Sequence, residues 1–149
     1  MKGHGSTVRL LLNEGAYIEA HSKEGWTALH LAAHFGHEVT VRLLLDMGAE
    51  LTLLLNNGAE IETRDRRDRT ALHSAAQFGH EATVQHLLDK RAQIEARDND
   101  GRTSLHLAAH FGHDVTVRLL LDRGARPMGK TGEGNAVLQL AQERRTKRY

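Results

Sequence analysis

The segment ALHLAAHFGHEVTVRLLLDMGAE (residues 28–50) recurs almost unchanged as SLHLAAHFGHDVTVRLLLDRGAR (residues 104–126), with 19 of 23 positions identical. A more divergent copy, ALHSAAQFGHEATVQHLLDKRAQ, occupies residues 71–93 between them. The first and second copies start 43 residues apart, whereas the second and third start 33 residues apart. The chain is therefore built from an internal repeat whose 33-residue period is interrupted once, by ten extra residues.

Each copy carries two short apolar patterns with helical spacing. In the third copy, Leu105, Ala108 and Ala109 predict an inner helix of about eight residues that ends at Gly112. A second apolar stripe from Val115 to Leu121 predicts an outer helix. Helices this short are marginal alone, so we expect them to bury their apolar faces by stacking on neighbouring copies.

A 33-residue unit with a T-x-L-H start, two short helical patterns and a Gly-Ala ending resembles the ankyrin repeat. The resemblance implies an all-α solenoid of stacked helix-turn-helix units, each preceded by a β-turn finger. The chain departs from the family at Ala28, Ala71 and Ser104, where proline is usual. Asp68 and Arg91 also stand where other copies carry glycine. A left-handed backbone at these two residues would cost on the order of 1 kcal/mol each.

Aligning the chain on the 33-residue period predicts one ankyrin-repeat domain over residues 1–149. The alignment begins with an outer helix that lacks its inner partner, so the chain opens in the middle of a repeat. We expect half repeats at the ends and full repeats between them: 3–21 (half), 22–54, 65–97 and 98–130 (full), and 131–149 (half, with the polar character of a cap).

The ten extra residues lie where the sequence repeats a helix ending. LTLLLNNGAE (51–60) matches VRLLLDMGAE (41–50) at six positions. We favour a remnant of a repeat that lost its finger and inner helix; the alternative is a leucine-rich loop insertion. Ten residues continued as a helix would carry the next finger about 15 Å away. We therefore expect an excursion from the stack, with a helical turn over residues 51–55.

Composition excludes several classes of function. The chain has 149 residues, no cysteine and a net charge of +1, and no apolar run approaches the roughly 20 residues of a membrane span. These features exclude disulfides and cysteine-ligated zinc and give no argument for a nucleic-acid or membrane partner. Two basic stretches, RDRRDR (64–69) and QERRTKRY (142–149), are interpreted as a salt-bridged, solvent-exposed finger and a solvated helix end. Without a signal sequence, we expect a cytoplasmic or nuclear protein.

Two further patterns raise enzymatic alternatives. GARPMGKT (124–131) formally matches a phosphate-binding loop, and a nucleotide-binding protein is the rival hypothesis. That chemistry requires a preceding strand, whereas an amphipathic helical pattern precedes this motif. The T-x-L-H and G-H histidines have structural roles in the family that the chain resembles. Only His34 and His110 remain as surface residues without such a role. No nucleophile and base are brought together, so we expect no catalysis, cofactor or metal.

The resemblance implies that fingers and inner-helix ends line a concave groove that binds a protein or peptide. An acidic partner with apolar anchors is expected, its identity unknown; a fragment without independent activity is the other alternative. Trp26 and the finger arginines are expected to be exposed, and the three Phe residues either contact the partner or pack on the adjacent helix. The candidate groove comprises Lys23, Glu24, Trp26, His34, Phe35, Arg66, Arg67, Arg69, Gln77, Phe78, Asn99, Asp100, Arg102, His110 and Phe111.

Overall fold

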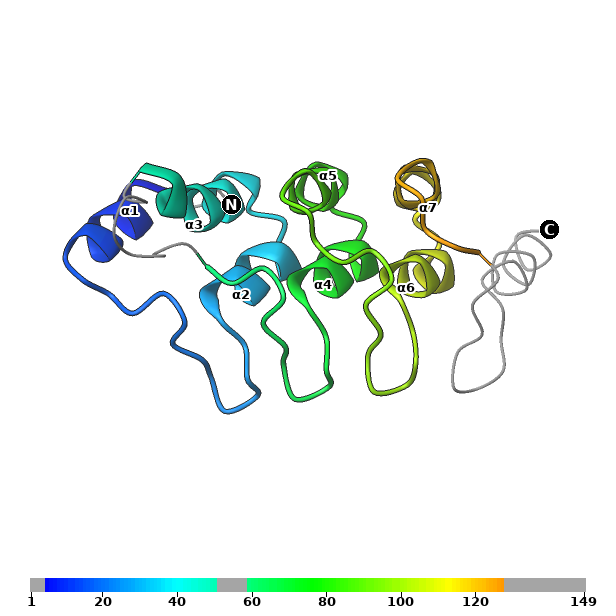
Figure 1. The fold of residues 1–149 in the computed structure, drawn as a ribbon, viewed down its shortest axis with the longest axis horizontal. Coiled ribbons are helices and arrows are strands. Elements are labelled where there is room, and N and C mark those ends of the chain that lie inside the picture. Colours follow the sequence, from blue (N-terminus) through cyan, green and yellow to red (C-terminus); the bar gives the residue numbers. More distant parts are fainter. Residues whose placement is uncertain (1–4, 51–58, 128–149) are drawn as a thin grey trace.

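The computed structural model describes residues 5–50 and 59–127, with the main chain only over 47–50. Within these ranges the regular structure is entirely helical (Figure 1). The elements are α1 (Gly5–Asn13), α2 (Ala28–His34), α3 (Glu38–Glu50), α4 (Ala71–Gln77), α5 (Glu81–Asp89), α6 (Ser104–Phe111) and α7 (Asp114–Asp122).

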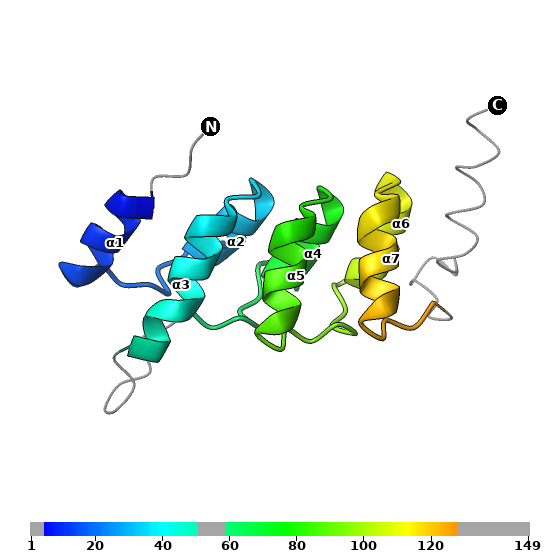
Figure 2. The ribbon, with the colours of Figure 1, turned by 90° about the horizontal axis from the view of Figure 1, so that it is seen from above.

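The helices form two parallel rows, with the fingers projecting below them (Figure 1). The inner row is α2, α4 and α6, and the outer row is α1, α3, α5 and α7; seen from above, the outer helices lie side by side (Figure 2). Each inner helix packs against the outer helix that follows it and against the inner helix of a neighbouring repeat. The predicted all-α repeat solenoid is confirmed.

The core runs continuously between the two rows. Each inner helix contributes a buried leucine and a pair of buried alanines, and the small alanines allow the inner helices to approach closely. The outer helices add Leu44, Leu87 and Leu120, all nearly inaccessible to solvent. Helix α4 is enclosed on both sides, because residues 71–76 are all buried and the helix packs against both α2 and α6.

Histidines fix the start of each inner helix. The Nδ1 atoms of His30, His73 and His106 accept the backbone N–H of the threonine three residues earlier, at 3.3, 3.1 and 3.1 Å. In His30 and His73, Nε2 donates to a carbonyl oxygen of the next finger, at 3.0 and 3.1 Å. These two imidazoles are therefore neutral, with the proton on Nε2, and they join one repeat to the next.

The histidines of the G-H pairs connect each repeat to the one before it. His80 Nε2 donates to the carbonyl oxygen of His34, and His113 Nε2 donates to that of Gln77, each at 2.9 Å. Each contact ties the start of an outer helix to the end of the inner helix in the preceding repeat. The structural role that the resemblance implied for these histidines is confirmed at both positions.

Left-handed backbone occurs at the predicted turn positions. Gly112 ends α6 with φ of 76°, as expected from the sequence. Asp68 and Arg91, which replace glycine, also have positive φ values of 61° and 66°. Both residues therefore adopt the left-handed backbone that would cost on the order of 1 kcal/mol each.

Replacing Arg91 with glycine is expected to stabilise the chain by up to about 1 kcal/mol, because glycine adopts positive φ without the steric penalty of a Cβ atom. Urea unfolding followed by circular dichroism measures the change. The matched control is Gln85→Gly, which removes an exposed side chain inside α5 and should destabilise by about 0.5–1 kcal/mol. Equal destabilisation by both substitutions would show that Arg91 is not strained.

The stack resumes at the second copy of the helix ending. Helix α3 has 13 residues, whereas α5 and α7 have nine each. The backbone N–H of Ala59 then donates to the Leu44 carbonyl at 2.9 Å, the contact that Ala92 makes with Leu87 and Ala125 with Leu120. Ala59 therefore takes the position that Ala49 would occupy in an uninterrupted repeat. The expected excursion and its turn over residues 51–55 fall on residues outside the described ranges and stay predictions.

Two more sets of hydrogen bonds join neighbouring repeats. The carboxylates of Glu19, Glu62 and Glu95 accept the backbone N–H of the residue after the closing alanine in the next repeat, at 2.8, 2.7 and 2.7 Å. The finger tips are linked by backbone bonds, from Arg66 N–H to Glu24 O and from Asn99 N–H to Arg67 O. All these contacts connect adjacent repeats. The C-terminal half repeat lies outside the described residues, and the repeat boundaries stay predictions.

Candidate functional site

A hollow of about 450 Å³ opens between the first two fingers and the carboxyl ends of α2 and α4. Every residue that lines it belongs to the predicted groove except Asp65. Its lining consists of Glu24, Trp26, His34, Asp65, Arg66, Arg67, Arg69, Gln77 and Phe78.

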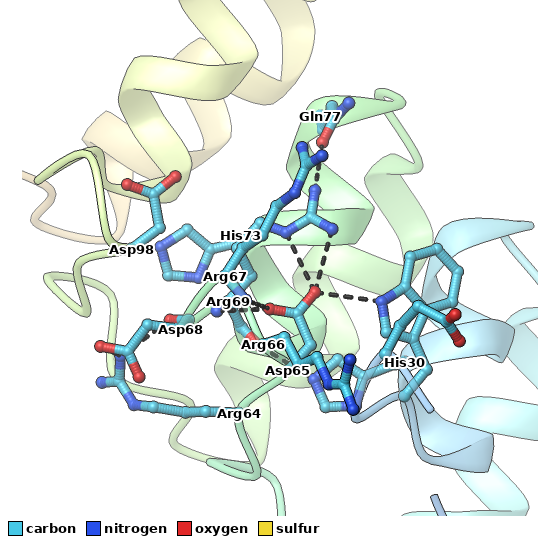
Figure 3. Close-up of polar contacts among 12 residues, drawn as sticks. His30, Arg64, Asp65, Arg66, Arg67, Asp68, Arg69, His73, Gln77 and Asp98 are labelled. Atoms are coloured by element: carbon cyan, nitrogen blue, oxygen red, sulfur yellow. Dashed lines mark hydrogen bonds and ion pairs between the residues drawn. The ribbon is translucent and has the colours of Figure 1, made fainter. Parts of the chain in front are cut away.

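Asp65 organises the second finger from a buried position (Figure 3). One carboxylate oxygen accepts the backbone N–H groups of Arg67 and Arg69, both at 2.9 Å. The other accepts the Arg69 guanidinium at 2.9 Å and the indole N–H of Trp26, on the first finger, at 3.1 Å. Five donor groups thus converge on one side chain. Both fingers are held at a fixed separation by this carboxylate.

The expected exposure of this finger is wrong in part. The side chain of Asp65 is 1% exposed and that of Arg69 is 14% exposed, because each neutralises the other and the Arg69 guanidinium also donates to Gln77. Trp26 is half-buried, with its only polar atom committed to Asp65. Trp26 and Arg69 therefore build the wall of the hollow and are not the freely exposed contact residues that the sequence predicted.

The electrostatics of Asp65 follow from these contacts. Burial alone would raise the pKa of its carboxyl group, but the hydrogen bonds from Arg69 and the guanidinium charge outweigh burial and lower the pKa below its ordinary value. The carboxylate is thus ionised at neutral pH. Its charge is balanced inside the wall of the hollow.

The rest of the RDRRDR run is exposed or half-exposed, as predicted. Arg64 forms an ion pair with Asp68 at 3.4 Å and donates to the Arg97 carbonyl of the next repeat at 2.8 Å. Arg66 and Arg67 are exposed, and within the described chain their guanidinium groups have no ion-pair partner. The finger therefore presents two exposed cations without an ion pair beside the hollow.

Aromatic rings form the end of the hollow nearest the inner helices. The ring centroid of His34 lies 4.3 Å from that of Phe78, 4.7 Å from Phe35 and 5.0 Å from Trp26. Phe35, Phe78 and Phe111 are 60%, 41% and 41% exposed. At Phe78 the packing interpretation is confirmed, because its ring packs against α2 through His34. The exposed part of the ring leaves contact with a partner as a prediction.

The remaining candidates lie outside this hollow. Lys23 is exposed on the first finger. On the third finger, Arg102 pairs with Asp98 at 3.2 Å and with Asp100, while the Asn99 amide donates to the Arg66 carbonyl. His110 is exposed on α6 beside Phe111, with ring centroids 4.9 Å apart. These residues continue the same face of the molecule but are not brought into the first hollow.

Comparisons with known proteins agree with this architecture. Residues 1–53 and 49–131 match the family described as "Ankyrin repeats (3 copies)". The chain belongs to the ankyrin repeat family. It is 45% identical over 49 residues to "Ankyrin repeat and KH domain-containing protein mask-1" of Caenorhabditis elegans, a match that covers 33% of this chain and 2% of the relative.

Two further relatives are named as regulatory subunits of a phosphatase. The chain is 40% identical over 45 residues to "Protein phosphatase 1 regulatory subunit 12A" of Mus musculus, and equally to the Rattus norvegicus protein of that name. These matches cover 30% of this chain and 4% of each relative. The similarity is thus confined to a short stretch of far longer proteins.

Sequence reasoning missed the buried aspartates of the second and third ankyrin fingers. Asp98 repeats the role of Asp65: it accepts the backbone N–H groups of Asp100 and Arg102 and pairs with the Arg102 side chain. The signal was the pattern D-x-x-x-R-T, present at residues 65–70 and 98–103. In the first finger Ser22 makes the equivalent backbone contacts, so the pattern is hidden there.

His30 and His73, which join neighbouring ankyrin repeats, are poor proton acceptors. Burial lowers the pKa of both His30 and His73 below the ordinary value of 6.5, and the hydrogen bonds to the finger carbonyls offset only part of this effect. A protonated ring would also direct an Nδ1–H at the threonine N–H that it now accepts. The neutral forms of His30 and His73 are therefore part of the folded structure.

Acidification is expected to destabilise the array. Because the pKa of His30 and His73 is lower in the folded chain, the unfolded chain binds more protons once the pH falls below about 6.5. The stabilisation is complete above that pH and is lost progressively as pH falls toward the folded-state pKa. Urea unfolding at pH 7.5 and 5.5 measures this loss, which should be smaller in His73→Gln. Equal unfolding free energies at the two pH values would contradict it.

The described residues give little support to the enzymatic alternatives. The helix α7 (Asp114–Asp122) precedes GARPMGKT, as expected, whereas Lys130 and Thr131 lie outside the described residues. Across 5–50 and 59–127, no group of three or more His, Asp or Glu side chains is arranged to hold a metal ion. In the same ranges, no helix is both long and apolar enough to cross a membrane.

Proposed function

We propose that this ankyrin-repeat array is a non-catalytic module that binds a protein or peptide partner through the concave face of its fingers and inner helices. The observation that carries the proposal is the hollow between the first two fingers, where exposed aromatic and arginine side chains stand on a rigid wall. Aromatic and arginine residues dominate the energetics of protein interfaces.

The family and its relatives support a protein partner. Ankyrin repeats are generally non-catalytic, and one relative is named as a regulatory subunit of a phosphatase. The fingers and inner-helix ends form a continuous surface, because backbone hydrogen bonds lock each finger to the next. A partner laid along this face would meet a pre-organised surface and would lose little affinity to ordering of the array.

Site-specific photocrosslinking in the intact chain tests which face binds. A benzoyl-phenylalanine photoprobe replaces Phe111, which is 41% exposed on the inner-helix side, and in a second variant replaces Val115, which is 56% exposed on the outer helix α7. We expect partner adducts, resolved by mass spectrometry in extracts of cells that express each variant, from position 111 only. Adducts from position 115 alone would assign binding to the outer-helix face and reject the proposal.

A further inference from the structure

We propose that the hollow between the first two fingers is a two-part subsite for an acidic side chain of the partner and an adjacent aromatic or aliphatic one. The inference deepens the proposed function, on which it rests, by assigning a chemistry to one place on the concave face. Both parts are argued from residues that line the hollow.

The cationic part of the subsite consists of the arginine side chains that are not neutralised by a carboxylate inside the wall of the hollow. The Asp65 carboxylate accepts hydrogen bonds from the Arg69 guanidinium, and Arg69 donates a further N–H to Gln77. Neither charge is therefore available to a ligand. Arg66 and Arg67 keep exposed guanidinium groups without an ion-pair partner in the described chain. Planar guanidinium groups match a carboxylate with two parallel hydrogen bonds.

One anion faces these cations. Glu24 lies on the first finger, and its carboxylate accepts the Ser22 hydroxyl at 2.9 Å. The Ser22 hydrogen bond is the main reason why the pKa of Glu24 is lowered, and the charge of Arg66 contributes less. Glu24 and Arg66 therefore partly compensate one another. Among the described residues no carboxylate forms an ion pair with Arg67, and a partner carboxylate is the group that would balance its charge.

The apolar part adjoins the cations. Phe78 leaves 41% of its surface exposed, and its ring meets that of His34, which in turn meets Trp26. The Asp65 contact fixes the Trp26 ring, so this surface is formed before a ligand arrives. A volume of about 450 Å³ lies within the usual range for ligand sites, which is about 300–1,000 Å³. The site thus has room for an apolar side chain beside the carboxylate.

The test is a selection from random peptides displayed on phage, panned against the whole 149-residue chain. Arg67→Glu is panned in parallel, because this change reverses the cation and keeps the backbone bonds that Arg67 makes to Asp65 and Asn99. The matched control is Arg118→Glu, the same charge reversal at an exposed position of α7. Unchanged circular dichroism spectra establish that both variants fold.

We expect peptides selected on the native chain to carry Asp or Glu beside Phe, Trp or Leu. Their affinity should fall about tenfold or more with Arg67→Glu, should fall with rising salt, and should be unchanged by Arg118→Glu. Phe78→Ala should weaken the same peptides. Selected peptides that lack acidic residues, or none selected at all, would overturn the inference.

The outcomes separate this inference from the proposed function. If peptides bind equally to the native chain and Arg67→Glu while photocrosslinks still form at position 111, the concave face binds a partner of different chemistry. Binding abolished by Arg118→Glu and retained by Arg67→Glu would reject both, because the outer-helix face would then be the working surface.

Discussion

Replacing Asp65 with alanine is expected to lower the free energy of unfolding by about 3–5 kcal/mol, because it leaves the Arg69 guanidinium charged, mostly buried and unpaired. The same change removes the acceptor of the Trp26 indole and of two backbone N–H groups in the finger. Urea unfolding followed by circular dichroism measures the loss. Tryptophan fluorescence, which here reports Trp26 alone, should show the finger loosening in the same transition.

The control for Asp65→Ala is Asp122→Ala, which removes an exposed carboxylate at the end of α7 and should change stability by less than about 0.5 kcal/mol. A double substitution, Asp65→Ala with Arg69→Ala, should recover part of the loss because no unpaired charge remains. If Asp65→Ala were as mild as the control, the carboxylate would not be the organising group of the second finger.

Replacing Leu72 with alanine is expected to cost about 2–5 kcal/mol. Leu72 is 1% exposed in α4, the inner helix that packs against both α2 and α6. The cavity would therefore open in the middle of the stack, where neighbours on both sides hold their positions and cannot collapse into it. Thermal and urea unfolding both measure the effect.

A leucine on the neighbouring inner helix provides the comparison. Leu31 on α2 is 43% exposed, so Leu31→Ala removes the same atoms from a site that is open to solvent, and we expect a cost below about 1 kcal/mol. Similar losses for Leu31→Ala and Leu72→Ala would indicate that α4 is not the enclosed centre of the array. The phage-selected peptides should bind both folded variants equally.

Much of the architecture was predictable because each copy repeats its own local signals. Helical spacing and Gly112 predicted the end of α6, and the glycine replacements showed where left-handed backbone would be costly, at Asp68 and Arg91. These features depend on residues close in sequence. An internal repeat shows which positions share an environment, so one copy informs the next.

The position at which the stack resumes was harder to predict, because residues 48–50 and 58–60 have the same Gly-Ala-Glu sequence. The deciding signal lies downstream. Only the second ending leads into the A-x-I-E pattern, which also occurs at residues 16–19 and 92–95. This pattern places Glu62 where its carboxylate reaches the backbone of the next repeat. This contact joins residues far apart in sequence, so neither local copy of the ending reveals it.

Charge patterning alone misled the interpretation of the second finger. Alternating Asp and Arg residues usually indicate a solvated surface, but Asp65 is withdrawn from water by backbone donors of its own turn. Whether a charge is buried depends on how many donors the fold gathers around it, and here one of them, the Trp26 indole, comes from another repeat. Residue type and spacing do not reveal such a gathering.

The hydrogen bonds between repeats also have a mechanical consequence. Every one of them connects adjacent repeats, so tension applied to the two ends should peel the array apart one unit at a time. A 33-residue repeat would release about 110 Å of extended chain, whereas the 43-residue interval between the first and second copies would release about 145 Å. In an optical trap, the ten extra residues should therefore appear as one step longer than its neighbours, which marks the first repeat by its length alone.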